Sequence, residues 1–189
     1  MNRRNLDETN ILSSSYAEYI VAKKTDLKDV LIKVGIVLAG LILAVVLLII
    51  TLKTVPTASF LILVFLVGLC GYALSFTKIE YEYIIVQGEL EVVKIFGKKK
   101  RKKILDLKFT EIEKIAPRAS FDASIKGMTI KKTTAACTKL SDDGVYGVLY
   151  MEKGDQKSVI YLNVIKRTLD TFKYYKRSIV EIDPKSLER

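Results

Sequence analysis

Hydrophobic positions are concentrated in two long runs in the first half of the chain. The first run, residues 34–52, contains 19 residues without a charge, and the second, residues 54–77, contains 24. A helix that crosses about 30 Å of hydrocarbon needs about 20 apolar residues. Two buried helices of a soluble protein are the alternative, but such helices rarely run so long without a polar residue. The pattern therefore predicts two membrane-spanning helices, at about residues 32–52 and 56–76.

The short link between the two runs predicts that the spans form a tight helical hairpin, residues 30–76. Pro56 stands in this link, where it ends the first helix or begins the second. Lysine and arginine are frequent on both flanks of the hairpin, whereas the link holds only Lys53. The positive-inside rule then predicts a cell-membrane protein with two spans and both termini in the cytoplasm. The position and flanks of the first run argue against a removable signal peptide.

After the hairpin the pattern changes to short alternating segments that are typical of β-strands. Gln87-Gly88 and Gly154-Asp155 are turn signals between such segments. Asn163 is predicted to cap a helix that runs to about Arg177 and covers a sheet with its apolar face, and residues 119–124 are predicted to form a loop. The predicted strands are residues 79–86, 89–96, 104–109, 128–138, 145–151 and 158–162.

This order of elements predicts an α+β membrane protein. A two-helix transmembrane hairpin is followed by an antiparallel barrel or sheet of the pleckstrin-homology (PH) type, closed by a C-terminal helix. Tyr81 and Tyr83 are expected to pack within the sheet, and Glu80 and Glu82 are expected to lie on its solvated surface. The segment around Tyr16 and Tyr19 either lies at the membrane interface or adds a short strand to the sheet.

Residues 77–107 carry a resemblance to a known family. They read TKIEYEYIIVQGELEVVKIFGKKKRKKILDL, in which EYEY-x(4)-GEL-x(4)-IFG followed by a basic run is distinctive. Together with IEKIAP and FKYYKRSIV further on, this resembles a domain-of-unknown-function family of small two-span membrane proteins from Gram-positive bacteria with a cytoplasmic PH-like domain. The resemblance covers nearly the whole chain after the first fifteen residues. It implies the PH-like fold but no activity and no catalytic residue.

Charge sharpens this picture. The chain has 31 Lys+Arg and 21 Asp+Glu, a net charge of +10. The predicted organisation is an N-terminal cytoplasmic segment at residues 1–29, the hairpin at 30–76, and a basic cytoplasmic domain at 77–189. The strongest cluster follows Gly97 and consists of Lys98, Lys99, Lys100, Arg101, Lys102 and Lys103.

The strand lengths indicate where this basic run lies. One strand leads away from the bilayer, and a second of equal length returns, so the run is expected near the headgroups of the inner leaflet. Each cation beside anionic lipid gains about 1 kcal/mol, which predicts an anionic-lipid site at Lys98–Lys103. A solvated turn that only orients the protein during insertion is the alternative. Nucleic acid is disfavoured, because the chain has no recognisable nucleic-acid-binding motif and is tethered to a membrane.

Small residues four apart recur in the predicted spans. Such pairs allow close helix packing, either between the two helices of the hairpin, which is the favoured interpretation, or in a dimer. Neither span has an Asp, Glu, Lys or Arg in its interior, which disfavours a channel or pump. The pairs are Gly35/Ala39, Gly40/Ala44 and Gly71/Ser75.

An enzyme is not predicted. The chain has no histidine and only two cysteines, Cys70 and Cys137, and no recognisable nucleophile, metal-ligand or phosphate-loop spacing. No cofactor and no metal site are therefore expected. The predicted function is a non-enzymatic, membrane-anchored adaptor or regulatory module, with the anionic inner leaflet and an unidentified protein as partners. The alternative is an accessory subunit of a membrane transporter or envelope complex, assembled through the hairpin; the oligomeric state is left open.

Overall fold

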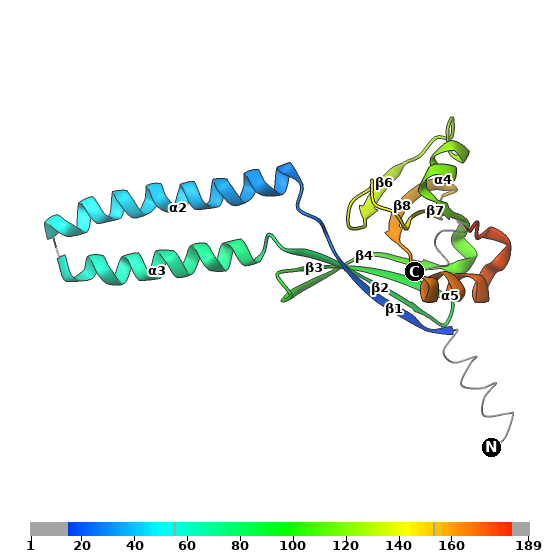
Figure 1. Ribbon diagram of the computed structural model, residues 1–189, viewed down its shortest axis with the longest axis horizontal. Helices are drawn as coiled ribbons and strands as arrows, with labels where there is room; N and C mark the ends of the chain where they lie inside the picture. Colours follow the sequence, from blue (N-terminus) through cyan, green and yellow to red (C-terminus); the bar gives the residue numbers. More distant parts are fainter. Residues whose placement is uncertain (1–14, 55, 153, 183–189) are drawn as a thin grey trace, which may run out of the picture. The chain divides into compact units, whose positions relative to one another are not determined.

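The computed structural model describes residues 15–54, 56–152 and 154–182 (Figure 1). The chain divides into two compact units. The helical unit consists of Lys24–Ile79 and Phe96–Lys100, and the sheet unit consists of the described residues of Met1–Lys23, Glu80–Ile95 and Arg101–Arg189. Parts of the predicted organisation lie outside the described residues: positions 1–14 of the N-terminal segment, 55 of the hairpin, and 153 and 183–189 of the basic domain.

Two apolar helices form most of the helical unit. Helix α2 covers Leu27–Thr54 and α3 covers Pro56–Ser75, and the two lie side by side (Figure 1). A hydrogen bond of 2.9 Å joins the hydroxyls of Thr51 and Ser59 across them. The segment Leu27–Leu52 is long and apolar enough to cross a membrane, whereas the corresponding apolar segment of α3, Ser59–Ser75, is shorter. One helix of the described residues thus has the length and composition of a membrane span.

The first sheet has the strand order β1-β2-β3-β4. Its strands are β1 (Ala17–Ala22), β2 (Ile79–Val86), β3 (Glu89–Phe96) and β4 (Lys100–Lys108). The predictions for β2 and β3 are confirmed at both ends. Of the two roles left open for the segment around Tyr19, the structure has the added strand, because β1 pairs antiparallel with β2 and sets Tyr19 opposite Tyr83.

The second sheet has the order β5-β7-β8-β6. Its strands are β5 (Ile112–Pro117), β6 (Lys132–Ala136), β7 (Val145–Glu152) and β8 (Gln156–Asn163). Of the predicted antiparallel barrel or sheet, the structure has two open sheets of four strands rather than a barrel. The prediction of purely antiparallel pairing is wrong, because β6 runs parallel to β8. The parallel pairing follows from the connection between β5 and β6, which contains a helix and carries the chain to the far edge of the sheet.

That connecting helix, α4 (Arg118–Ser124), replaces the predicted loop at residues 119–124. The prediction failed because one apolar residue in a polar segment was not recognised as an anchor. The ring of Phe121 is fully buried and packs edge-to-face on Tyr161, with the ring centroids 5.9 Å apart. A Cβ atom on Gly147 of β7 would lie 2.1 Å from that ring, so glycine leaves the space that Phe121 fills.

The C-terminal helix α5 covers Lys166–Lys176, and its N-cap is Ile165 rather than the predicted Asn163. Asn163 is used elsewhere, because its side-chain oxygen accepts a hydrogen bond from the Thr138 amide at 2.7 Å. The predicted apolar face is present: Leu169 and Phe172 are fully buried. Phe172 lies 5.7 Å from the ring centroid of Phe109, in the 3₁₀ turn η1 (Phe109–Glu111). A second 3₁₀ turn, η2 (Arg177–Ile179), follows α5.

The two sheets are tied together by Tyr83 of β2. Its hydroxyl donates a short hydrogen bond to the Ala136 carbonyl of β6 and accepts one of 3.3 Å from the Asn163 amide of β8. The side chain is almost completely buried, and burial raises the pKa of the Tyr83 phenol far above its usual range. The expectation that Tyr83 is a packing residue of the sheet is confirmed.

Candidate functional site

The turn between β3 and β4 carries the start of the basic run. It spans Phe96 to Lys99, and the Lys99 amide donates a hydrogen bond of 3.1 Å to the Phe96 carbonyl. Gly97 (φ 57°) and Lys98 (φ 61°) both have left-handed backbone conformations, which is the type I′ geometry of tight β-hairpins. A lysine in this conformation costs about 1–2 kcal/mol. The turn therefore keeps a charged side chain at a position that glycine would fill without strain.

This turn lies against the C-terminal end of α3, within the helical unit. The Gly97 amide donates a hydrogen bond of 2.8 Å to the Lys78 carbonyl. A Cβ atom on Gly97 would lie 2.7 Å from the Ser75 carbonyl oxygen, so only glycine fits. The ammonium of Lys99 lies 5.2 Å from the ring centroid of Tyr72, within cation–π range. These contacts hold Gly97, Lys98 and Lys99 beside the last turn of the helix.

The six residues of the basic run are all exposed, but they are not equivalent. Arg101 Nη1 lies 3.3 Å from Glu82 Oε2. Lys103 lies 3.2 Å from Glu91 and 3.0 Å from Asp106, and hydrogen bonds to Asp106 and Glu91 raise the pKa of its ammonium. In the part of the chain that the structure describes, no ion pair holds the other four members, Lys98, Lys99, Lys100 and Lys102.

Glu82 is the residue of this region that sequence reasoning placed wrongly. It was expected on the solvated surface, yet it is only 2% exposed. The cause is the strand β1, which sets Ile20 directly beside Glu82. Oε2 of Glu82 has no hydrogen-bond partner among the described residues, so its contact with Arg101 is an ion pair without hydrogen-bond geometry. Arg101 is thus the counter-charge of a buried carboxylate.

The small residues of the predicted spans have different surroundings in the helical unit. Gly40 faces α3, because a Cβ atom there would lie 2.2 Å from the sulfur of Cys70. A Cβ atom on Gly35 or Gly71 would meet nothing within 4 Å. The structure therefore brings Gly40, but neither Gly35 nor Gly71, against the neighbouring helix. Of the other members of the pairs, Ala39 is exposed, whereas Ala44 and Ser75 are half-buried.

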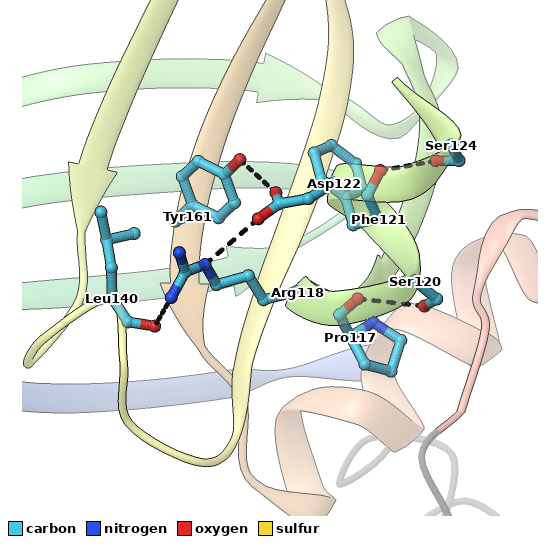
Figure 2. Close-up of polar contacts among 8 residues, drawn as sticks. All are labelled: Pro117, Arg118, Ser120, Phe121, Asp122, Ser124, Leu140 and Tyr161. Carbon is cyan, nitrogen blue, oxygen red and sulfur yellow. Dashed lines mark hydrogen bonds and ion pairs between the residues drawn. The ribbon is translucent and has the colours of Figure 1, made fainter. Parts of the chain in front are cut away.

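A polar network on the sheet unit was not foreseen from the sequence (Figure 2). Asp122 of α4 accepts a hydrogen bond of 2.6 Å from the Tyr161 hydroxyl and pairs with Arg118 at 3.3 Å. Arg118 also donates to the Leu140 carbonyl at 2.6 Å. Burial and the hydrogen bond to Asp122 raise the pKa of Tyr161 to about 12. The Arg-x-x-x-Asp spacing, which favours an i,i+4 pair on a helix, was the available signal.

Beside this network lies a cleft of about 660 Å³, whose walls include Arg118, Asp122 and Asn163. None of the six basic residues lines it. Cys137 is buried, and burial raises the pKa of its thiol to about 11, which makes it unreactive near neutral pH. Among the described residues, no three His, Cys, Asp or Glu side chains are grouped so that they could hold a metal ion.

Comparison with known families agrees with this architecture. The model of the family Bacterial PH-like domain (DUF6106) matches residues 13–181. The chain belongs to this DUF6106 family. This confirms the predicted resemblance to a domain-of-unknown-function family with a bacterial PH-like domain. The two spans, the Gram-positive origin and the cytoplasmic location stay predictions. No curated protein and no solved structure matches the chain significantly.

Proposed function

We propose that this DUF6106 protein is a non-enzymatic, membrane-anchored adaptor or regulatory module whose PH-like domain is held against anionic lipid. The proposed contact is the β3–β4 turn with Lys98, Lys99 and Lys100, together with Lys102 further along β4. The observation that carries the proposal is the position of this turn beside the end of α3. If α3 ends at the membrane surface, the turn and its lysines lie at the level of the headgroups.

The exposed apolar surface of the helical unit supports two membrane spans. In α2, Leu31 is 70% and Ile42 is 65% exposed, and in α3, Phe65 is 70% exposed. A helix with apolar side chains on every side is typical of a lipid-facing segment, because water would otherwise surround them. Helix α3 has 20 residues from Pro56 to Ser75, which is about the length that a span requires.

The magnitudes favour the four lysines as the lipid contacts. Each cation near an anionic surface contributes about 1 kcal/mol, so four contribute about 4 kcal/mol before screening by salt. If Arg101 turned toward lipid, it would leave the buried Glu82 without its counter-charge. That loss costs more than the ~1 kcal/mol that one lipid contact returns. Arg101 is therefore expected to stay with Glu82.

Lysine footprinting of the full-length protein tests the proposal. The protein is reconstituted into neutral or anionic liposomes, and the acetylation rate of each lysine by a water-soluble N-hydroxysuccinimide ester is read by mass spectrometry. The four lysines should react more slowly in anionic liposomes, and the difference should shrink in high salt. The exposed Lys126 and Lys132 serve as internal references. Equal rates in both liposomes would contradict the lipid contact.

The second candidate, an accessory subunit assembled through the spans, is favoured by one observation. Space is open at Gly35 and Gly71, so a further helix could approach α2 or α3 there. Replacing Gly35 or Gly71 by leucine should then abolish a complex in the membrane while the lysine footprint stays unchanged. If the complex persists in both variants, the partner does not use these faces.

A further inference from the structure

We infer that the four lysines Lys98, Lys99, Lys100 and Lys102 respond to the density of negative charge on a membrane and not to the structure of one lipid headgroup. The ligand class is any anionic lipid surface, and the response follows surface potential. This inference rests on the proposed function and specifies what the same site recognises.

The cations of the basic run that are available to contact lipid are all of one kind. Headgroup recognition by fixed geometry typically uses the planar guanidinium fork, which binds a phosphate through two parallel hydrogen bonds. The only arginine of the basic run, Arg101, is paired with the buried Glu82. Lys103 is paired with Glu91 and Asp106. The cations left for lipid are all lysines, which act as compact point charges on flexible stems.

The backbone of these lysines is held more firmly than their side chains. The structure fixes the backbone of the turn, through Gly97 against Lys78 and Ser75, while the lysine side chains remain exposed. Lys99 has the ring of Tyr72 within reach, but a cation–π contact orients the ammonium without selecting an anion. Sites that recognise one small molecule instead enclose it with convergent polar groups. The cleft beside Arg118 and Asp122 is lined by other residues.

Lys98 has a strained, left-handed backbone conformation at the tip of the turn. Gly97 must be glycine because of the Ser75 carbonyl, so the other left-handed position of the turn is where a side chain can stand. In the β2–β3 turn, the equivalent second position holds Gly88 (φ 81°). The β3–β4 turn instead carries a lysine at φ 61°. This arrangement adds one more positive charge at the tip, where a surface potential acts on it, on a flexible stem that does not fix the direction of its hydrogen bonds.

The test compares lipids at matched surface potential. Full-length protein is reconstituted into liposomes of phosphatidylglycerol, phosphatidylserine or cardiolipin, each diluted with phosphatidylcholine to the same measured zeta potential. A surface potential of about −30 to −50 mV concentrates protons about three- to sevenfold, and so lowers the free-amine fraction and the acetylation rate of a nearby lysine by that factor. We expect the four lysines to slow by this factor in all three lipids, with agreement within twofold.

The outcomes separate this inference from the proposed function. If one lipid slows the four lysines far more than the others at equal zeta potential, the site recognises a headgroup, and this inference is wrong while the lipid contact stands. If none of the lipids slows them, the proposed function itself fails. Soluble glycerol phosphate, added to neutral liposomes, shows whether free phosphate accounts for the effect. We expect it to leave the rates unchanged, and protection by it would overturn the requirement for a surface.

Discussion

Replacing Arg101 by glutamine should destabilise the sheet unit without releasing it from lipid. The side chain of Glu82 is 3% exposed, and its Oε2 lies 3.3 Å from Arg101 Nη1. Removing one partner of a fully buried ion pair costs roughly 3–5 kcal/mol, because the other charge is left uncompensated. The Arg101 side chain is 66% exposed, so water reaches one side of this pair and reduces the cost. We therefore expect a loss of about 1–3 kcal/mol in the free energy of unfolding.

The matched control is Lys102→Gln, on the neighbouring residue of the same strand. Lys102 is exposed, so its neutralisation should change the free energy of unfolding by less than about 0.5 kcal/mol. It should, however, remove about 1 kcal/mol of attraction to anionic lipid. The two substitutions each remove one positive charge from the basic run, and they are expected to act on different quantities.

The assay is guanidinium-induced unfolding of the full-length protein in neutral detergent micelles, followed by tyrosine fluorescence, since the chain has no tryptophan. The Glu82→Gln/Arg101→Gln double variant should recover part of the stability that Arg101→Gln loses, because no charge is left buried. The pairing of Arg101 with Glu82 would be contradicted if Arg101→Gln unfolded like the wild type and weakened the lysine footprint in anionic liposomes as much as Lys102→Gln does.

Three further predictions follow from single positions. Lys98→Gly and Gln87→Gly should each raise the free energy of unfolding by about 0.5–1 kcal/mol, since both residues have left-handed backbones (φ 61° and 51°). Only Lys98→Gly should reduce the salt-dependent protection of the remaining lysines from acetylation. Gly40→Val should lower the melting temperature of the full-length protein in detergent, because its Cβ would lie 2.2 Å from the sulfur of Cys70 in α3. Gly35→Val, in open space, should not lower it, and equal melting temperatures of the two variants would contradict this packing. Burial raises the pKa of Cys137 to about 11, whereas the unfolded thiol ionises near 8.5 to 9, so the unfolded chain loses this proton first and the free energy of unfolding should fall by about 2 kcal/mol between pH 9 and 11. Cys137→Ala should flatten that part of the alkaline unfolding profile, and an unchanged profile would contradict the burial of the thiol.

Alternation of apolar and polar residues predicted the strands that pair with their sequence neighbours. Strands β2 and β3 meet through Gln87-Gly88, and β7 and β8 meet across Gly154. The sequence does not decide pairings between strands that lie far apart along the chain. It leaves the added strand around Tyr19 as one of two alternatives, and it predicts a strand within residues 128–138 without its parallel pairing. Strand β1 pairs with β2, although both apolar helices lie between them in the sequence. Strand β6 pairs parallel to β8, and β7 lies between them in the sequence. Local pattern carries no information about such pairings, because they are decided by tertiary packing.

The candidate site was predictable as a charge cluster but not as a set of roles. The distribution of charged residues along the sequence is enough to locate Lys98–Lys103. The division into paired and unpaired cations depends on Glu82, whose burial follows from the pairing of β1 with β2. The close approach of Gly97 to the Ser75 carbonyl likewise depends on a contact between segments that are distant in sequence. In this protein, tertiary structure decides which of the six basic residues are held in ion pairs.

Photo-crosslinking from the lipid headgroup shows whether the β3–β4 turn lies against anionic lipid. Full-length protein is reconstituted into liposomes that contain a trace of anionic lipid with a photoreactive headgroup, and the labelled peptides are mapped by mass spectrometry. A parallel sample with a photoreactive acyl chain confirms that α2 is inserted. We expect headgroup labelling concentrated on residues 96–102. The lipid contact is contradicted if the acyl-chain probe labels α2 while the headgroup probe leaves residues 96–102 unlabelled.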